Sequence, residues 1–61
     1  MTFVEFTTSN DKKIFINKEC ISELIDANGK VYNTIIKTNG GSSFLIREEL
    51  SDVIRKIHLA V

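Results

Sequence analysis

The spacing of hydrophobic positions changes near residue 50 of this chain. Four apolar residues there are spaced i, i+3, i+4 and i+7, which places them on one face of an amphipathic helix. The apolar segment 44–46, directly before them, has the character of a strand. We therefore expect a C-terminal helix whose core face consists of Leu50, Val53, Ile54 and Ile57.

The N-terminal part of the chain predicts a β-hairpin. Residues 2–9 are rich in Phe, Val and Thr, and residues 13–17 alternate around an Ile-Phe-Ile run, as is typical of strands. Asn10–Asp11 has the composition of a tight turn. With these two residues at the tip, Phe6 lies opposite Phe15, an aromatic cross-strand pair worth about 0.2–1 kcal/mol over Ala–Ala.

The middle of the chain predicts a second hairpin. Asn28–Gly29 is its strongest signal, because both central residues of a type I′ turn need positive φ, which Asn tolerates and Gly adopts freely. This turn sets Ile25 opposite Tyr32. It makes residues 31–38 one long strand.

A third turn at residues 39–41 allows two registers. With Gly40–Gly41 at the tip, Ile36 pairs with Leu45. With Asn39–Gly40 at the tip, Ile36 pairs with Ser43. We prefer the first register because it matches apolar with apolar, and a slip of one residue would reverse which faces are buried.

The order of these elements predicts one α+β domain over residues 1–61, a small antiparallel β-meander of four to five strands closed by one C-terminal α-helix. Both faces of the expected sheet carry apolar side chains. One face holds Leu24, Val31, Ile35 and Ile46, and the other holds Ile25, Tyr32, Ile36 and Leu45. Because one short helix covers only one face, we expect a partner chain to cover the rest.

Chain length supports the same expectation. A domain of 61 residues buries only about 60% of its unfolded surface, so disulfides, metals or oligomerisation usually supplement such a core. The single Cys20 excludes an intrachain disulfide, and Cys20 with His58 cannot form a tetrahedral metal site. We therefore expect a homo-oligomer, a dimer or higher, whose contact surface is the sheet face or edge that bears Phe3, Phe6 and Phe15.

Charge and hydropathy narrow the range of partners. Eight basic and eight acidic residues give a formal net charge of zero, so the basic surface that binds duplex DNA is not expected. No apolar run approaches the roughly 20 residues that span a bilayer, and the N-terminus lacks the basic and long apolar regions of a signal peptide. We expect a cytoplasmic protein without membrane insertion.

Few residues suggest catalysis. Glu48 and Glu49 are adjacent carboxylates that could act as an acid–base pair, but both fit the positive end of a helix dipole equally well. His58 fits the negative end of the same helix, and the Gly-rich segment 39–43 lacks the Lys of a phosphate-binding loop. We therefore expect no enzymatic activity and no cofactor or metal.

Three stretches of the sequence and two single residues carry a family resemblance. Residues 7–17 read Thr-Thr-Ser-Asn-Asp-Lys-Lys-Ile-Phe-Ile-Asn, and Ile21, Gly41, the segment Ile-Arg-Glu at 46–48 and the segment Val-Ile-Arg-Lys-Ile at 53–57 follow in order. In this order the chain resembles the small FlbD-type flagellar and swarming-motility proteins, with Asp11 at the position of their usual turn glycine. The resemblance implies a non-enzymatic protein that acts through contacts, and it supplies no catalytic residue.

Our first hypothesis is therefore a small oligomeric binding or adaptor module of the motility type, with itself and an unidentified protein or small ligand as partners. The alternative is a phage or mobile-element protein that binds a host protein or sequesters a small ligand, such as a nucleotide, between subunits. A third hypothesis is single-stranded RNA binding, because Phe3, Phe6 and Phe15 are interleaved with Lys12 and Lys13 as in stacking platforms.

Overall fold

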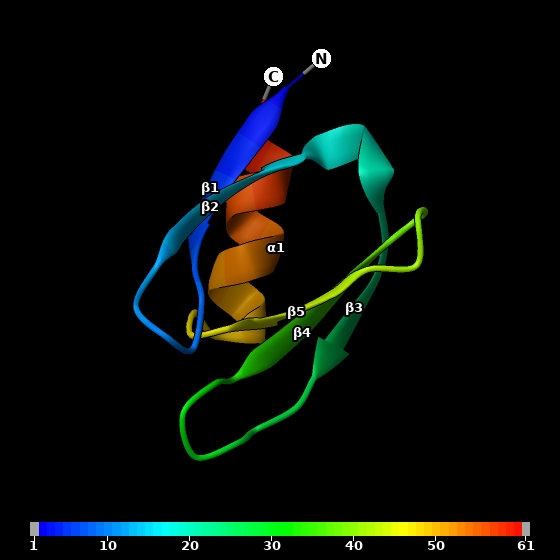
Figure 1. Ribbon diagram of the computed structural model, residues 1–61. Coiled ribbons are helices and arrows are strands. Elements are labelled where there is room, and N and C mark those ends of the chain that lie inside the picture. Colours follow the sequence, from blue (N-terminus) through cyan, green and yellow to red (C-terminus); the bar gives the residue numbers. More distant parts are fainter. Residues whose placement is uncertain (1, 61) are drawn as a thin grey trace.

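The computed structural model describes residues 2–60 and confirms the α+β class (Figure 1). Its described part contains five strands, one turn of 3-10 helix and one C-terminal α-helix. In chain order these are β1 (Phe3–Thr7), β2 (Lys13–Asn17), η1 (Lys18–Cys20), β3 (Ile21–Asp26), β4 (Thr34–Thr38), β5 (Ser43–Ile46) and α1 (Leu50–Leu59).

The strands form two antiparallel sheets, one of β1–β2 and one in the order β3–β4–β5. The two sheets meet at one corner, where Thr8 and Ile46 form an isolated bridge and the Arg47 amide donates to the Thr7 carbonyl at 2.8 Å. On the opposite side η1 connects β2 to β3, and no ladder joins those two strands. This leaves a seam between β2 and β3, and α1 contacts both β1 and β3.

The core draws on both sheets and on the helix. Its buried apolar residues are Val4, Phe6, Ile16, Ile36, Ile46 and Val53. Phe6 is 0% exposed, so it does not share a surface with Phe3 and Phe15 as the sequence suggested. The reason is strand alternation, which places odd and even residues of β1 on opposite faces.

The first and last hairpins, β1–β2 and β4–β5, each have a three-residue loop. In the first, the Thr8 amide donates to the Lys12 carbonyl at 2.8 Å, and in the second the Thr38 amide donates to the Ser42 carbonyl at 3.0 Å. The third loop residue has positive φ in both, 65° at Asp11 and 89° at Gly41. Two-residue turns at these positions were therefore wrong.

The extra loop residue shifts both registers by one. Phe6 pairs with Ile14 and not with Phe15. Ile36 pairs with Phe44, which excludes both registers considered for the third turn. A slip of one residue exchanges the faces of a strand, so Phe15 lies on the outer face of its sheet and Phe44 packs against the core.

The predicted type I′ turn at Asn28–Gly29 was also wrong. β3 ends at Asp26 and β4 begins at Thr34, and Ile25 pairs with Ile35. A type I′ turn requires positive φ at both central residues. Of Asn28 and Gly29, only Asn28 has it. A Cβ on Gly29 would lie 2.8 Å from the Tyr32 ring, so this glycine provides room for an aromatic ring within the loop 27–33.

The corrected registers regroup the sheet faces. Ile36 shares the inner face with Leu24 and Phe44, its cross-strand neighbours. Three aliphatic residues pair across the outer face instead: Ile25, Ile35 and Leu45. Val31 and Tyr32 lie in the loop before β4 and belong to neither strand face.

Candidate binding groove

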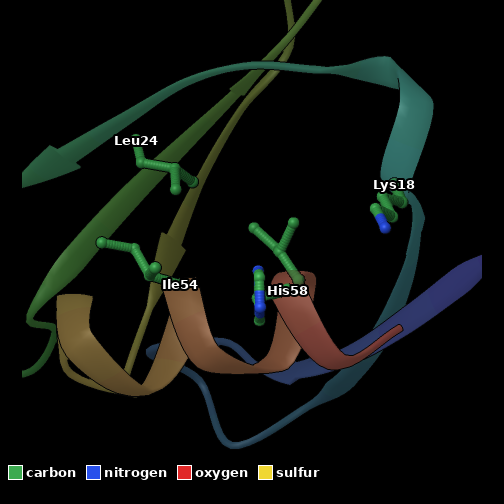
Figure 2. A pocket seen from close by; sticks show the side chains of 5 residues that line it. Lys18, Leu24, Ile54 and His58 are labelled. Carbon is green, nitrogen blue, oxygen red and sulfur yellow. The ribbon is translucent and has the colours of Figure 1, made fainter. Parts of the chain in front are cut away.

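An apolar cavity of about 330 Å³ lies between α1 and β3, at the seam between the sheets (Figure 2). It is lined by Lys18, Leu24, Ile54, Ile57 and His58, and we call it the α1–β3 groove. Figure 2 shows Leu24 pointing from β3 toward the helix and Ile54 pointing from α1 toward β3. Side chains from two elements far apart in sequence therefore form its two walls.

The helix stripe predicted from the sequence divides between the core and this groove. Val53 is 0% exposed and belongs to the core, and Ile57 packs against it. Leu50 is partly exposed. Ile54 is 50% exposed, so its predicted place in the core was wrong. The cause is the seam, because β2 and β3 share no ladder and Ile54 lines the groove beside β3.

Two basic side chains stand at one end of the groove. Lys18 Nζ donates to the Ala60 carbonyl at 2.8 Å, and Ala60 is the C-cap of α1. His58 lies in the last turn of the helix, at the position predicted for it. A cation is favourable at a helix C-terminus, and the Lys18 ammonium gives the apolar groove one electropositive end.

Glu48, one of the two carboxylates considered for acid–base chemistry, makes hydrogen bonds that hold the structure together. The Glu48 carboxylate accepts from the Thr7 amide, at 3.0 Å to Oε1 and 3.3 Å to Oε2, and from Lys56 Nζ at 2.9 Å. Lys56 Nζ also donates to the Glu5 carbonyl at 2.8 Å and lies 5.4 Å from the centre of the Phe6 ring. Glu48 and Lys56 thus fasten the helix to β1.

These contacts also set the charge of Glu48. Partial burial alone would raise its pKa, but hydrogen bonds from Lys56 and from the Thr7 amide outweigh burial, and the pKa of Glu48 is lowered. The carboxylate is therefore ionised at neutral pH and committed to its donors. Glu49 occupies the N-cap of α1 without a side-chain capping bond.

A second, polar cavity of about 420 Å³ lies at the other end of the helix. Its lining comprises Asp26, Asn28, Asn33, Glu49, Leu50 and Ser51. Two of these residues are carboxylates and, within the described part of the chain, none is Lys or Arg. The two carboxylates would repel a phosphate group. The composition of this cavity therefore does not favour binding of a nucleotide or another anionic ligand.

The remaining candidate residues are distributed over the surface. Phe3 and Phe15 are 56% and 63% exposed on the outer face of β1–β2. Cys20 is an exposed free thiol. Residues 2–60 contain no group of three or more His, Cys, Asp or Glu side chains placed to hold a metal ion.

The sequence did not predict the groove, although it singled out three of its lining residues, all on α1. The helical spacing places Ile54 and Ile57 on a core stripe and His58 at the helix end. Leu24 and Lys18 come from β3 and η1, and nothing in the local sequence indicates that they approach the helix.

Comparisons of the chain with protein-family models, curated proteins and solved structures find no match. In the segment 2–60, no helix has both the length and the apolar character to cross a membrane.

Proposed function

We propose that this chain is a non-enzymatic, cytoplasmic binding module that holds an apolar side chain of a partner protein in the α1–β3 groove. The observation that carries the proposal is the position of Ile54, half exposed on α1 and facing Leu24 across the α1–β3 groove. Exposed apolar surface that lines a concavity is typical of partner sites.

The free edge of β3 indicates the conformation of that partner. The Ala27 amide donates to the Asn33 carbonyl at 3.0 Å. Hydrogen-bonded and non-hydrogen-bonded pairs alternate along an antiparallel ladder, so the next hydrogen-bonded pair is Ile25–Ile35, and the pair Leu24–Ile36 is not hydrogen-bonded. The backbone groups of Leu24 therefore point away from β4, toward the open side of the sheet. An extended partner segment that pairs there places a side chain over the groove, as in β-strand addition.

The electropositive end adds a chemical preference. Lys18 and His58 line one end of a cavity whose other lining residues are apolar. An acidic residue close to the inserted apolar side chain would meet these groups. We therefore propose a partner segment that combines a bulky aliphatic or aromatic residue with a nearby Asp or Glu.

The resemblance of residues 7–17 and 46–57 to FlbD-type proteins supports an adaptor role in flagellar or swarming motility. Proteins of that type act through contacts, and the surroundings of Glu48 are consistent with a structural rather than a chemical duty. Self-association is part of the same proposal, since the outer face of β1–β2 exposes two phenylalanine rings.

The test is a selection from a displayed library of short random peptides, first on the wild-type protein and then on two helix variants. Ile54→Asn removes the groove wall. Arg55→Asn introduces the same residue at the neighbouring exposed position and serves as the control. We expect enriched peptides with an apolar residue beside an acidic one, about tenfold weaker on Ile54→Asn and unchanged on Arg55→Asn. Peptides that bind both variants equally would refute the groove.

A further inference from the structure

The two edges of the β1–β2 hairpin differ in how their backbone groups are satisfied. The Thr8 amide donates to the Lys12 carbonyl at 2.8 Å, and the Lys18 amide donates to the Thr2 carbonyl at 2.7 Å. These two bonds lie at the two ends of the β1–β2 ladder. In an antiparallel ladder every second residue pair is hydrogen-bonded, so the hydrogen-bonded pairs between them are Phe6–Ile14 and Val4–Ile16. The backbone groups of Lys13, Phe15 and Asn17 therefore point outward from β2.

The outward edge of β1 is occupied. The Glu48 carboxylate accepts from the Thr7 amide, the Arg47 amide donates to the Thr7 carbonyl, and Lys56 Nζ donates to the Glu5 carbonyl. The outward edge of β2 has no such cover, because among residues 2–60 no backbone hydrogen bond outside the ladder uses Lys13, Phe15 or Asn17. An open strand edge of this kind is a template for another strand.

The sequence of β2 identifies which strand fits. Lys-Ile-Phe-Ile-Asn has the same pattern in both directions about Phe15. An antiparallel copy centred there pairs Phe15 with its own equivalent, Ile14 with Ile16, and Lys13 with Asn17. Within Lys13–Asn17 every outward backbone group then finds a partner, each apolar residue meets an apolar one, and no like charges are opposed.

Exposed aromatic surface lies next to this edge. Phe15 and Phe3 are on the same outer face, because Phe3 pairs with Asn17, two residues from Phe15. With a phenylalanine burying about 150–250 Å², four rings at 56% and 63% exposure contribute at most roughly 350–600 Å². That is about half of the roughly 1,000 Å² that the smallest specific interfaces bury, so the paired strands have to provide the rest.

We infer that two copies of this chain associate through their β2 edges, in antiparallel register about Phe15, and so form a continuous four-stranded sheet. One self-complementary strand suffices for a closed two-fold dimer. We expect a weak dimer, with a dissociation constant in the micromolar range. This inference specifies the self-association within the proposed function and does not depend on the α1–β3 groove.

The test combines sedimentation velocity with amide hydrogen exchange of the full chain, over concentrations from about 10 µM to about 1 mM. Two variants disrupt the pairing differently. Phe15→Thr removes the ring and keeps strand propensity, while Phe15→Pro removes an outward amide that the monomer does not use. Leu45→Thr, on the outer face of the other sheet, is the matched control.

For the wild type we expect the mass to rise from 6.9 kDa toward twice that value, with the Lys13, Phe15 and Asn17 amides becoming protected as it rises. Both Phe15 variants should weaken association by about tenfold or more, and Leu45→Thr should leave it unchanged. Peptide binding in the groove should survive Phe15→Thr, and dimerisation should survive Ile54→Asn, so the two proposals fail separately.

Three results would overturn the inference. The first is a wild-type protein that stays monomeric over the whole range. The second is a dimer whose Lys13, Phe15 and Asn17 amides exchange as fast as in the dilute monomer. The third is a monomer that binds a fluorescent single-stranded oligouridine and loses that binding in Phe15→Thr, which would assign the exposed rings to base stacking.

Discussion

The two flanks of α1 are built differently. The flank toward β1 places Val53 in the core and fastens the helix through the Glu48–Lys56 ion pair at 2.9 Å. The flank toward β3 carries Ile54, half exposed, beside a groove. The helix is thus attached by one flank and leaves the other open. A short chain can in this way keep a binding surface without losing its core.

The largest expected difference between the flanks concerns Val53 and Ile54, neighbouring β-branched residues on the same helix. Val53→Ala should lower the free energy of unfolding by about 2 kcal/mol, because the truncation leaves a cavity. Ile54→Ala should cost less than about 1 kcal/mol, because half of its side chain is already in water. Urea melts of both variants measure the difference, and equal costs would show that the flanks are alike.

The ion pair gives the second effect. Glu48→Gln should lower the free energy of unfolding by about 1–2 kcal/mol at pH 7, because the Thr7 amide and Lys56 lose a charged acceptor. Glu49→Gln is the adjacent control and should have little effect, since Glu49 makes no capping bond. Urea melts at pH 7 compare the two, and an equal loss in both would remove Glu48 from the attachment.

The same pair predicts a pH dependence. The pKa of Glu48 is lowered from its ordinary value of 4.5, so its stabilising contribution is present above that value and is lost as pH falls through the folded pKa. The difference in unfolding free energy between wild type and Glu48→Gln should therefore shrink from pH 7 to acid pH. A difference that stays constant down to about pH 2 would contradict the assignment.

The smallest effect on stability belongs to the open flank. Lys18→Met removes a hydrogen bond to the Ala60 carbonyl and should cost about 0.5–1 kcal/mol. It should weaken binding of acidic groove peptides by about fivefold while leaving peptides without an acidic residue unchanged. Lys12→Met, at the tip of the β1–β2 hairpin, is the control, and fluorescence titrations measure peptide binding to both variants. An equal loss of affinity in Lys12→Met would show that the effect comes from net charge and not from the position of Lys18.

Strands and helix followed from local sequence, but registers did not. The composition of residues 2–9, 13–17 and 43–46 fixes extended backbone, and the spacing from Leu50 to Ile57 fixes a helix. Register depends on loop length, and each loop contains one residue more than the expected two-residue turn, Ser9 in the first and Asn39 in the second, and ends on a left-handed residue. That single residue moved Phe6 away from Phe15 and changed the face of Phe15.

The groove depends on an arrangement that local patterns do not encode. Val53 and Ile54 have nearly equal hydrophobicity, and only the seam between β2 and β3 decides that one is buried and the other is not. Lys18 reaches the helix end from a turn 42 residues earlier in the chain. The helix stripe was therefore predictable as an apolar surface, but its division between core and groove was not.

The central claim is that partners bind on the open flank of α1. The most direct test is a titration of an enriched groove peptide into protein with labelled isoleucine methyl groups, followed by methyl NMR spectra. We expect saturable shifts at Ile54 and Ile57, with Ile35 on the central strand and outer face of the β3–β4–β5 sheet unaffected. A shift at Ile35 without any at Ile54 would contradict the account.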